Sequence, residues 1–192
     1  MRGRSDPAAA LLSGVQNADA PPRMNVFLVG PMGSGKSAVG RQLAQRLDLD
    51  FIDSDAEIEA RTGVDIAYIF EREGEAGFRS REAEVIDALS RRDRVLVSTG
   101  GGAILDASTR EHLRTRGRVV YLRTSVDQQL ARTRRSNDRP LLNNDDPRGT
   151  LERLFEQRAP LYTEVAEIVV DTDGRKVKTV VDQICHQLGV EG

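Results

Sequence analysis

The sequence predicts an α/β protein in which helices cover both faces of a five-stranded parallel sheet, a three-layer α/β/α arrangement. Short apolar segments alternate with stretches of helical spacing, which is typical of βαβ units and parallel sheets. Residues 30–37 match the phosphate-binding loop G-x-x-x-x-G-K-[ST], which joins a strand to a helix. Because the crossovers of βαβ units are right-handed, helices are expected on both faces of the sheet.

Each predicted strand is a short apolar run, and the five runs lie at 25–29, 50–52, 94–98, 118–122 and 168–170. The predicted helices carry apolar residues at helical spacing and cover 38–47, 56–61, 65–72, 78–89, 107–115, 126–135, 149–159 and 176–188. Ser54 or Asp55 is expected to cap the second of these helices, and Gly63 is expected to end it. Gly74 and Gly77 are expected to separate the third helix from the fourth.

Two polar segments lie outside this pattern. Residues 1–23 end at Pro21-Pro22 and are predicted to be a disordered extension in front of a single domain at 24–190. Residues 136–148 contain many turn formers and have little to bury, which predicts an exposed, mobile loop.

Composition favours a soluble monomer of the cytoplasm. The 192 residues are 39% hydrophobic and 30% charged, and the net charge of −2 provides no bulk attraction to nucleic acid or to anionic membranes. No apolar run approaches the length of a membrane span, and no segment presents a large apolar face. The single cysteine, Cys185, excludes an internal disulfide, so a reducing cytoplasm is expected.

The loop at 30–37 predicts binding of a nucleoside triphosphate with Mg²⁺. Its small residues let backbone N–H groups form a concave anion site, and the N-terminus of the following helix adds partial positive charge. Lys36 supplies an ammonium group for the β- and γ-phosphates, and Ser37 offers a hydroxyl to Mg²⁺. The alternative, a glycine-rich turn that binds nothing, is disfavoured because a predicted strand and helix flank the loop. The loop does not identify the group that receives the phosphate.

Further candidates lie at the same edge of the predicted sheet, because ligands bind beyond the carboxyl ends of parallel strands. Asp53 and Asp55 follow the second strand, where one carboxylate could hold Mg²⁺ or its waters and the other could accept the proton of an attacking hydroxyl. The alternative is a pair of helix-capping aspartates. Gly100-Gly101-Gly102 follows the third strand and could bring backbone N–H groups close to a ligand, or it could be a flexible turn.

Arg79, Arg139 and Arg158 are candidates for anion binding. Arg139 lies in the polar loop, where an arginine could close over the transferring phosphoryl group. Arg158 ends a helix after that loop, and two arginine side chains that met at one place would suit a carboxylate or phosphate acceptor. The alternative is that these are solvated surface residues, as arginines usually are.

The chain resembles the shikimate kinase family over residues 25–188. Six motifs in the family's order and at similar intervals carry the resemblance, and apart from the phosphate-binding loop each would be weak alone. They are Gly-Pro-Met-Gly-Ser-Gly-Lys-Ser at 30–37, Asp-Ser-Asp at 53–55, Gly-Glu-Ala-Gly-Phe-Arg at 74–79, Gly-Gly-Gly at 100–102, Arg-Pro-Leu-Leu at 139–142 and Arg-Ala-Pro-Leu-Tyr at 158–162. The resemblance implies a P-loop kinase architecture with a mobile lid at about 136–148. It also implies transfer of the γ-phosphoryl group of Mg-ATP to the 3-hydroxyl of shikimate, a step toward the aromatic amino acids.

The resemblance implies residue roles as well. The implied catalytic residues are Asp55, Lys36 and Arg139. The implied ATP-binding residues are Gly33, Ser34, Gly35, Lys36, Ser37, Ala38, Arg132 and Arg139. The implied shikimate-binding residues are Asp55, Arg79, Gly101, Gly102 and Arg158, with the two arginines holding the carboxylate. Ser37 and Asp53 are the implied Mg²⁺ ligands, Asp53 acting through water. Ala38 departs from the threonine of many members, and little effect is expected because Ser37 already fills the metal position.

Two other functions fit parts of this pattern. One is a P-loop kinase with a different acceptor, such as gluconate or a nucleoside monophosphate. Only 4% of the residues are aromatic, and no aromatic-rich insertion is present to build a nucleobase pocket. The other is a regulatory module that binds ATP without catalysis. A site that has lost its catalytic activity does not need every catalytic and metal-binding side chain. The alternative is therefore disfavoured, because the sequence keeps all four: Lys36, Ser37, Asp53 and Asp55.

Overall fold

The computed structural model describes residues 24–133 and 145–190. Its centre is one sheet of five parallel strands in the order β2-β3-β1-β4-β5. The strands are β1 (Val26–Val29), β2 (Asp50–Asp53), β3 (Val95–Ser98), β4 (Arg118–Arg123) and β5 (Ile168–Asp171). The predicted parallel α/β sheet is therefore confirmed, and all five strands lie at the predicted places with ends that differ by one residue at most.

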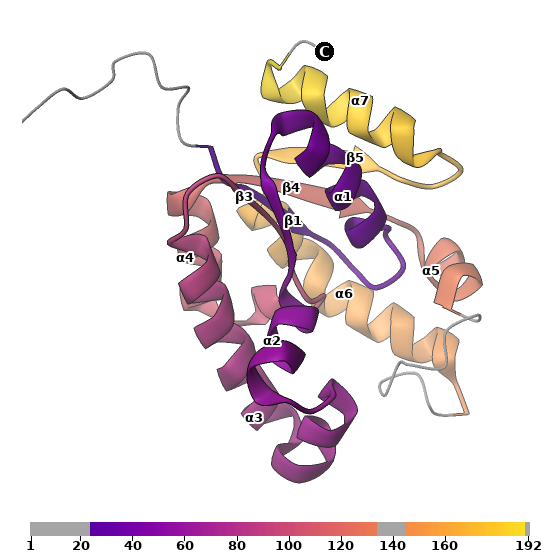
Figure 1. Ribbon diagram of the computed structural model, residues 1–192. Helices are drawn as coiled ribbons and strands as arrows, with labels where there is room; N and C mark the ends of the chain where they lie inside the picture. Colours follow the sequence, from indigo (N-terminus) through magenta and orange to yellow (C-terminus); the bar gives the residue numbers. More distant parts are fainter. Residues whose placement is uncertain (1–23, 134–144, 191–192) are drawn as a thin grey trace, which may run out of the picture.

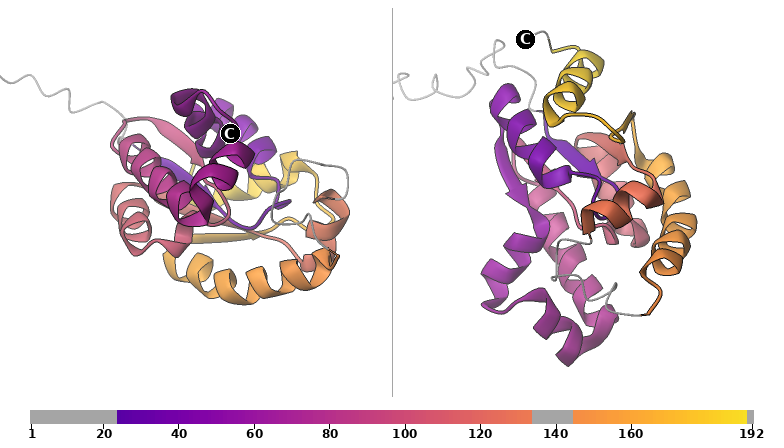
Figure 2. Two further views of the ribbon diagram at one scale, coloured as in Figure 1. Left: turned by 90° about the horizontal axis from the view of Figure 1, so that it is seen from below. Right: turned by 90° about the vertical axis from the view of Figure 1, so that its right-hand side faces the viewer.

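Seven α-helices and a short 3₁₀ helix surround the sheet within the described ranges. They are α1 (Lys36–Leu47), α2 (Ser54–Thr62), α3 (Ile66–Ser90), η2 (Ala103–Leu105), α4 (Ala107–Arg116), α5 (Val126–Thr133), α6 (Pro147–Val165) and α7 (Val177–Leu188). Figures 1 and 2 show α1 and α7 on one face of the sheet and α3, α4 and α6 on the other. This is the predicted three-layer arrangement.

Two apolar cores lie between these layers, because alternate residues of a strand point to opposite faces. Phe27 and Val29 of β1 pack with the buried side chains of α3, α4 and α6. Val26 and Leu28 pack with those of α1 and α7. All four β1 side chains are fully buried, as expected for the central strand of a parallel sheet. Burial on both faces fixes the register. Because every strand pair is parallel, the carboxyl ends of the strands meet at one edge.

The start of α2 differs from the prediction. Asp53, rather than Ser54 or Asp55, is the N-cap: its Oδ1 accepts a hydrogen bond from the backbone N–H of Asp55 at 3.1 Å. Ser54 is already helical and fully buried. The predicted C-terminal end is confirmed, since Gly63 adopts φ 72°, a conformation that favours glycine.

The predicted break between the third and fourth helices is only a bend. Gly74 has non-helical angles (φ 69°, ψ −176°) and bends α3, whereas Gly77 lies in the helix with no break. A Cβ atom at Gly77 would lie 2.5 Å from Cβ of Glu73, so the close turn after the bend requires glycine there. The ion pair between Glu73 and Arg81, at 2.7 Å, spans the bend.

Helix α6 is longer than predicted at both ends. It begins at Pro147, capped by the side chain of Asp146, so the final residues of the predicted loop at 136–148 are helical. It also continues through Pro160 to Val165. Proline within a helix is unfavourable, but burial of Tyr162 and Val165 against the sheet outweighs the lost hydrogen bond.

Several predictions concern residues outside the described ranges. They are the extension at 1–23, the part of the predicted lid at 136–144, and Arg139 within it. The division into an extension and a domain at 24–190 stays a prediction. Among the residues that the structure does describe, no helix is long and apolar enough to cross a membrane.

Candidate active site

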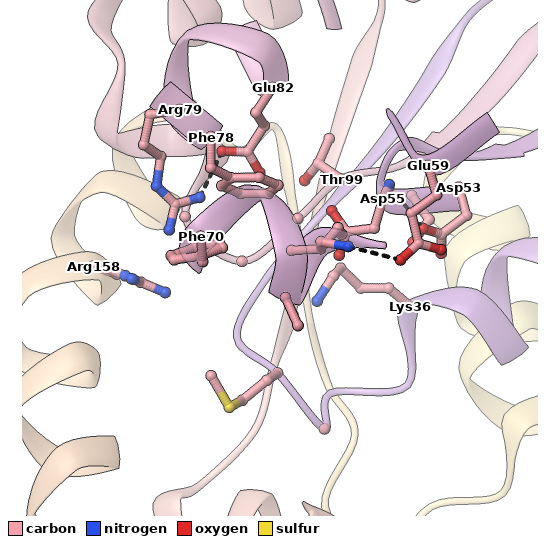
Figure 3. Close-up of a pocket in the computed structure, with 18 residues that line it drawn as sticks. Lys36, Asp53, Asp55, Glu59, Phe70, Phe78, Arg79, Glu82, Thr99 and Arg158 are labelled. Carbon is pink, nitrogen blue, oxygen red and sulfur yellow. Dashed lines mark hydrogen bonds and ion pairs between the residues drawn. The ribbon is translucent and has the colours of Figure 1, made fainter. Parts of the chain in front are cut away.

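A cavity of about 350 Å³ lies at the carboxyl edge of the sheet. Three segments that end or follow strands reach it: the phosphate-binding loop after β1, residues 53–55 after β2 and residues 98–102 at the end of β3. Helix α3 closes one side, and Arg158 of α6 reaches in from another. In Figure 3, Arg79 and Arg158 lie on one side of the cavity, and Lys36, Asp53 and Asp55 lie on the other.

The phosphate-binding loop joins β1 to α1 as predicted. The Nζ atom of Lys36 donates to the carbonyl oxygens of Gly30 at 2.8 Å and Pro31 at 2.9 Å, so its ammonium group lies over the loop. Gly35 has φ 92° and precedes α1 without a side-chain cap, and no acidic residue lies in the first turn. The N-terminal amides of α1 therefore form a site that favours an anion.

Ser37 and Asp53 lie together beside this loop. Oγ of Ser37 donates to Oδ2 of Asp53 at 2.8 Å, while Oδ1 of Asp53 caps α2. Within 24–133 and 145–190, no cluster of three or more His, Cys, Asp or Glu residues suits a metal ion. Mg²⁺ in phosphoryl-transfer sites usually takes most of its ligands from phosphates and water, with one or two from the protein. A hydroxyl and one carboxylate in contact fit such an ion.

Asp55 lies close to Glu82 of α3 across Gly100. A Cβ atom at Gly100 would overlap Oε1 of Glu82 and would lie 2.8 Å from Oδ1 of Asp55. The backbone N–H of Gly100 donates to Oγ of the buried Ser54 at 3.0 Å, which fixes the turn. Two carboxylates therefore crowd position 100, which favours glycine there, and Asp55 lines the cavity from the first turn of α2.

Glu82 is a site residue that the sequence analysis missed. It is 2% exposed, and its Oε2 accepts a hydrogen bond from Nη1 of Arg79 at 2.6 Å (Figure 3). Burial raises the pKa of Glu82, and the positive charge of Arg79 opposes that shift. A signal was present, because Glu82 falls on the apolar stripe of Phe78, Val85 and Ile86, where a charged side chain needs a buried partner.

Arg79 and Arg158 both line the cavity, although they come from different helices. Burial opposes the charge of Arg79, but its ion pairs with Glu82 and Glu75 outweigh burial and raise its pKa. Burial lowers the pKa of Arg158, which is 4% exposed; Tyr162 opposes this shift and the charge of Arg79 adds to it. The Nε atom of Arg158 has no hydrogen-bond partner among the described residues. Two guanidinium groups that repel each other at one cavity favour an anion between them.

One wall of the cavity is apolar. The rings of Phe70 and Phe78 lie on either side of the bend in α3, with centroids 4.8 Å apart. Ile66, Ala67 and Met32 extend this wall. Apolar spacing on a helix does not distinguish a core from a ligand cavity, so the sequence alone does not place Phe70 and Phe78 in this wall.

The remaining predicted residues divide into three groups. Gly33, Gly101 and Gly102 line the cavity, and Gly102 packs so closely under Arg79 that a Cβ atom there would overlap the guanidinium group. Arg132 lies outside the cavity lining, and its Nη1 donates to the carbonyl of Gly33 at 2.8 Å. The other residues of the loop and first turn that lie outside this lining are Ser34, Gly35, Ser37 and Ala38.

Comparison with known proteins agrees with this geometry. The family model described as "Shikimate kinase" matches residues 32–189. The shikimate kinase of Shewanella sp. (strain ANA-3) is 56% identical over 167 residues, which cover 87% of this chain and 98% of the relative. A solved structure of shikimate kinase from Acinetobacter baumannii in complex with shikimate is 47% identical, with a TM-score of 0.85 over 87% of this chain and 93% of that one. Another, from Bacteroides thetaiotaomicron, is 31% identical with a TM-score of 0.80 over 87% of this chain and 99% of that one. The chain belongs to the shikimate kinase family.

Proposed function

We propose that this protein transfers the γ-phosphoryl group of Mg-ATP to the 3-hydroxyl of shikimate, giving shikimate 3-phosphate and ADP on the route to the aromatic amino acids. One observation carries the proposal: Arg79, Arg158 and Asp55 share a single cavity with the phosphate-binding lysine, Lys36. An acceptor with a carboxylate at one end and hydroxyls at the other matches this division of charge. A relative of known structure binds shikimate, which supports the same acceptor.

The nucleotide side of the site is assigned to the phosphate-binding loop. The amides at the start of α1 would bind the phosphates, and Lys36 would leave its carbonyl partners to bind the β- and γ-phosphate oxygens. The hydroxyl of Ser37 would hold Mg²⁺ directly and Asp53 would hold it through water. The ion, when bound, would neutralise charge on the transferring phosphoryl group. The assignment of Arg132 to ATP binding and that of Arg139 to the phosphates stay predictions.

The acceptor side is assigned to the cavity. Arg79 and Arg158 would bind the carboxylate, and the wall formed by Phe70 and Phe78 would pack against the carbon ring. The oxygen of the acceptor hydroxyl would then form a bond to the γ-phosphorus while Asp55 accepts the proton of that hydroxyl. At the same time the bond between the γ-phosphorus and the bridging oxygen would break and release ADP. Positioning of the two reactants supplies much of such a rate enhancement.

The rival acceptors make different demands on this cavity. Gluconate carries a carboxylate but has no ring to pack against Phe70 and Phe78. A nucleoside monophosphate needs a pocket for its base beside the phosphate site. A regulatory ATP-binding module does not need an acceptor cavity in which Asp55 and two arginines lie beside the phosphate-binding lysine. Membership of the shikimate kinase family favours shikimate over these alternatives.

The test is ADP release from Mg-ATP by the purified protein, with shikimate, gluconate and AMP supplied in separate reactions. We expect release with shikimate alone. Release with gluconate or AMP but not shikimate would keep the phosphate-binding chemistry and overturn the acceptor. Nucleotide binding without acceptor-dependent release would instead establish the regulatory module. A cytoplasmic location and a monomeric state stay predictions.

A further inference from the structure

We propose that Tyr162 is a positioning residue of the acceptor site, holding the turn of α6 that carries Arg158 at a fixed spacing from the glycine turn at 100–102. This inference rests on the proposed function, because it assigns to Tyr162 an effect on shikimate binding. Tyr162 lies four residues after Arg158 on α6, so both side chains project from the same face of the helix.

The side chain of Tyr162 is fixed at both ends. Its hydroxyl donates a hydrogen bond to the carbonyl oxygen of Gly101 at 2.5 Å. Its ring stacks on Tyr121 of β4, with centroids 4.9 Å apart and an interplanar angle of 27°. The residue is only 1% exposed, so the hydrogen bond does not compete with bulk water. The ring therefore joins α6 to the sheet, and the hydroxyl joins it to the acceptor cavity.

The partner of this hydroxyl lies at the centre of the site. A Cβ atom at Gly101 would lie 3.5 Å from the carbonyl oxygen of Gly30 and 3.6 Å from the backbone nitrogen of Met32. The peptide of Gly101 is thus packed between the phosphate-binding loop and Tyr162. Since C=O and N–H of a trans peptide point in opposite directions, holding the carbonyl also fixes the direction of the N–H of Gly102, which lies under Arg79.

Pro160 makes the hydrogen bond between Tyr162 and Gly101 more important. It lies inside α6 between Arg158 and Tyr162, and a proline cannot donate the backbone hydrogen bond that would hold this turn. Nearby, Arg158 is buried, with no hydrogen-bond partner for its Nε among the described residues. A turn weakened by proline and carrying a buried charge needs an anchor outside the helix, and the hydroxyl of Tyr162 supplies one.

The structure offers a matched control for a test. The hydroxyl of Tyr121 belongs to the same ring stack and is equally buried, but it has no hydrogen-bond partner in the described part of the chain. Tyr162→Phe and Tyr121→Phe therefore each remove one buried hydroxyl and keep the ring. Only Tyr162→Phe removes the contact with Gly101.

The experiment measures KM for shikimate, KM for Mg-ATP and kcat in wild type and both variants, with the thermal unfolding midpoint of each. We expect Tyr162→Phe to raise KM for shikimate about five- to tenfold, the effect of one buried hydrogen bond, and to leave KM for Mg-ATP unchanged. Tyr121→Phe should leave both constants unchanged. In a protein that already carries Arg158→Lys, Tyr162→Phe should raise KM for shikimate little further, because the guanidinium group that Tyr162 positions is already replaced.

Three outcomes would overturn the inference. The first is equal shikimate KM values for Tyr162→Phe and Tyr121→Phe, even if Tyr162→Phe lowers the unfolding midpoint, because the hydroxyl would then have only a structural role. The second is that Tyr162→Phe raises KM for Mg-ATP as much as it raises KM for shikimate. The third is that Tyr162→Phe raises KM for shikimate by a further five- to tenfold in the protein that already carries Arg158→Lys. Absence of shikimate-dependent turnover in wild type is a separate result, which would overturn the proposed function and this inference with it.

Discussion

Arg79 and Arg158 place positive charge at one end of a single cavity, and Asp55 lies beside Lys36 at the other end. Each of these groups needs the fold for its position, because the four residues lie on four different helices, α1, α2, α3 and α6. Gly100 and Gly102 bring the chain close enough to Asp55 and Arg79 that side chains there would overlap them.

Asp55→Asn should separate catalysis from nucleotide binding. The amide cannot accept the proton of the acceptor hydroxyl, so we expect kcat to fall by about 10²-fold or more. The affinity for Mg-ATP should change little, and titration with the nucleotide checks this. Asp50→Asn is a control, because Asp50 is an exposed carboxylate at the start of β2, the strand that leads to Asp55. Normal turnover by the Asp55 variant would remove this residue from the mechanism.

Arg158→Ala should weaken the acceptor and not the nucleotide. Removing one partner of a buried charge contact costs on the order of 2–5 kcal/mol, which should appear as a large rise in KM for shikimate. Arg153→Ala on the same helix is the control, since Arg153 is exposed and its side chain donates hydrogen bonds to Gly149 and Thr150 of its own helix. A variant at Arg158 that binds shikimate as wild type does would contradict the carboxylate assignment.

At the scale of single elements, the bend of α3 shapes the acceptor cavity. Ile66, Ala67 and Phe70 line the cavity before the bend, and Phe78 and Arg79 line it after the bend. The angle at Gly74 therefore sets how the two halves of the wall meet. Farther along α3, Asp87 joins this helix to α4 through Arg116 at 2.7 Å and His112 at 3.2 Å.

Gly74→Ala should affect both stability and the acceptor. An alanine at φ 69° costs about 1 to 2 kcal/mol of folding free energy, and relief of the strain should reshape the cavity wall and raise KM for shikimate. Gly189→Ala is a control at another positive-φ glycine, because Gly189 has φ 73° at the end of α7 and a Cβ atom at either glycine would meet no neighbour. Its ψ of 23° is in the left-handed helical region, so this variant should lose less stability than Gly74→Ala, measured by chemical unfolding, and should keep normal kinetics. Equal kinetics for both variants would show that the bend does not shape the site.

Asp87→Asn should change the pH dependence of stability. Hydrogen bonds from Arg116 and Arg91 lower the pKa of Asp87 to about 2 in the folded protein, below its ordinary value of 3.8. A lowered folded-state pKa stabilises the protein above the unfolded-state pKa, and this contribution is lost as pH falls from about 4 toward 2. The variant should thus be less stable than wild type at neutral pH, with a difference that shrinks across this window. Chemical unfolding of wild type and variant at a series of pH values from neutral down to about 2 checks this, and a difference that stays constant across the series would contradict it.

At the scale of the whole molecule, the sequence predicted what depends on local pattern. The five strands and the phosphate-binding loop followed from apolar runs and one motif, and the parallel order placed the carboxyl ends at one edge. The passage of α6 through Pro160 could not be predicted, because it depends on burial of Tyr162 against β4. The pairing of Glu82 with Arg79 was missed because a charged residue on a helix is usually solvated. Where Arg158 would lie relative to Arg79 depends on the packing of α6 against the sheet, which no local pattern specifies.

The most direct test of the acceptor site compares shikimate with its methyl ester as substrates of the wild-type enzyme. The ester keeps the ring and the 3-hydroxyl but lacks the negative charge that Arg79 and Arg158 are proposed to bind. No substitution is made, so altered folding cannot produce the result. We expect kcat/KM to fall by about two orders of magnitude or more with the ester, in line with 2–5 kcal/mol for a lost partner of a buried charge. Equal kcat/KM values for the acid and the ester would contradict recognition of the carboxylate in this cavity.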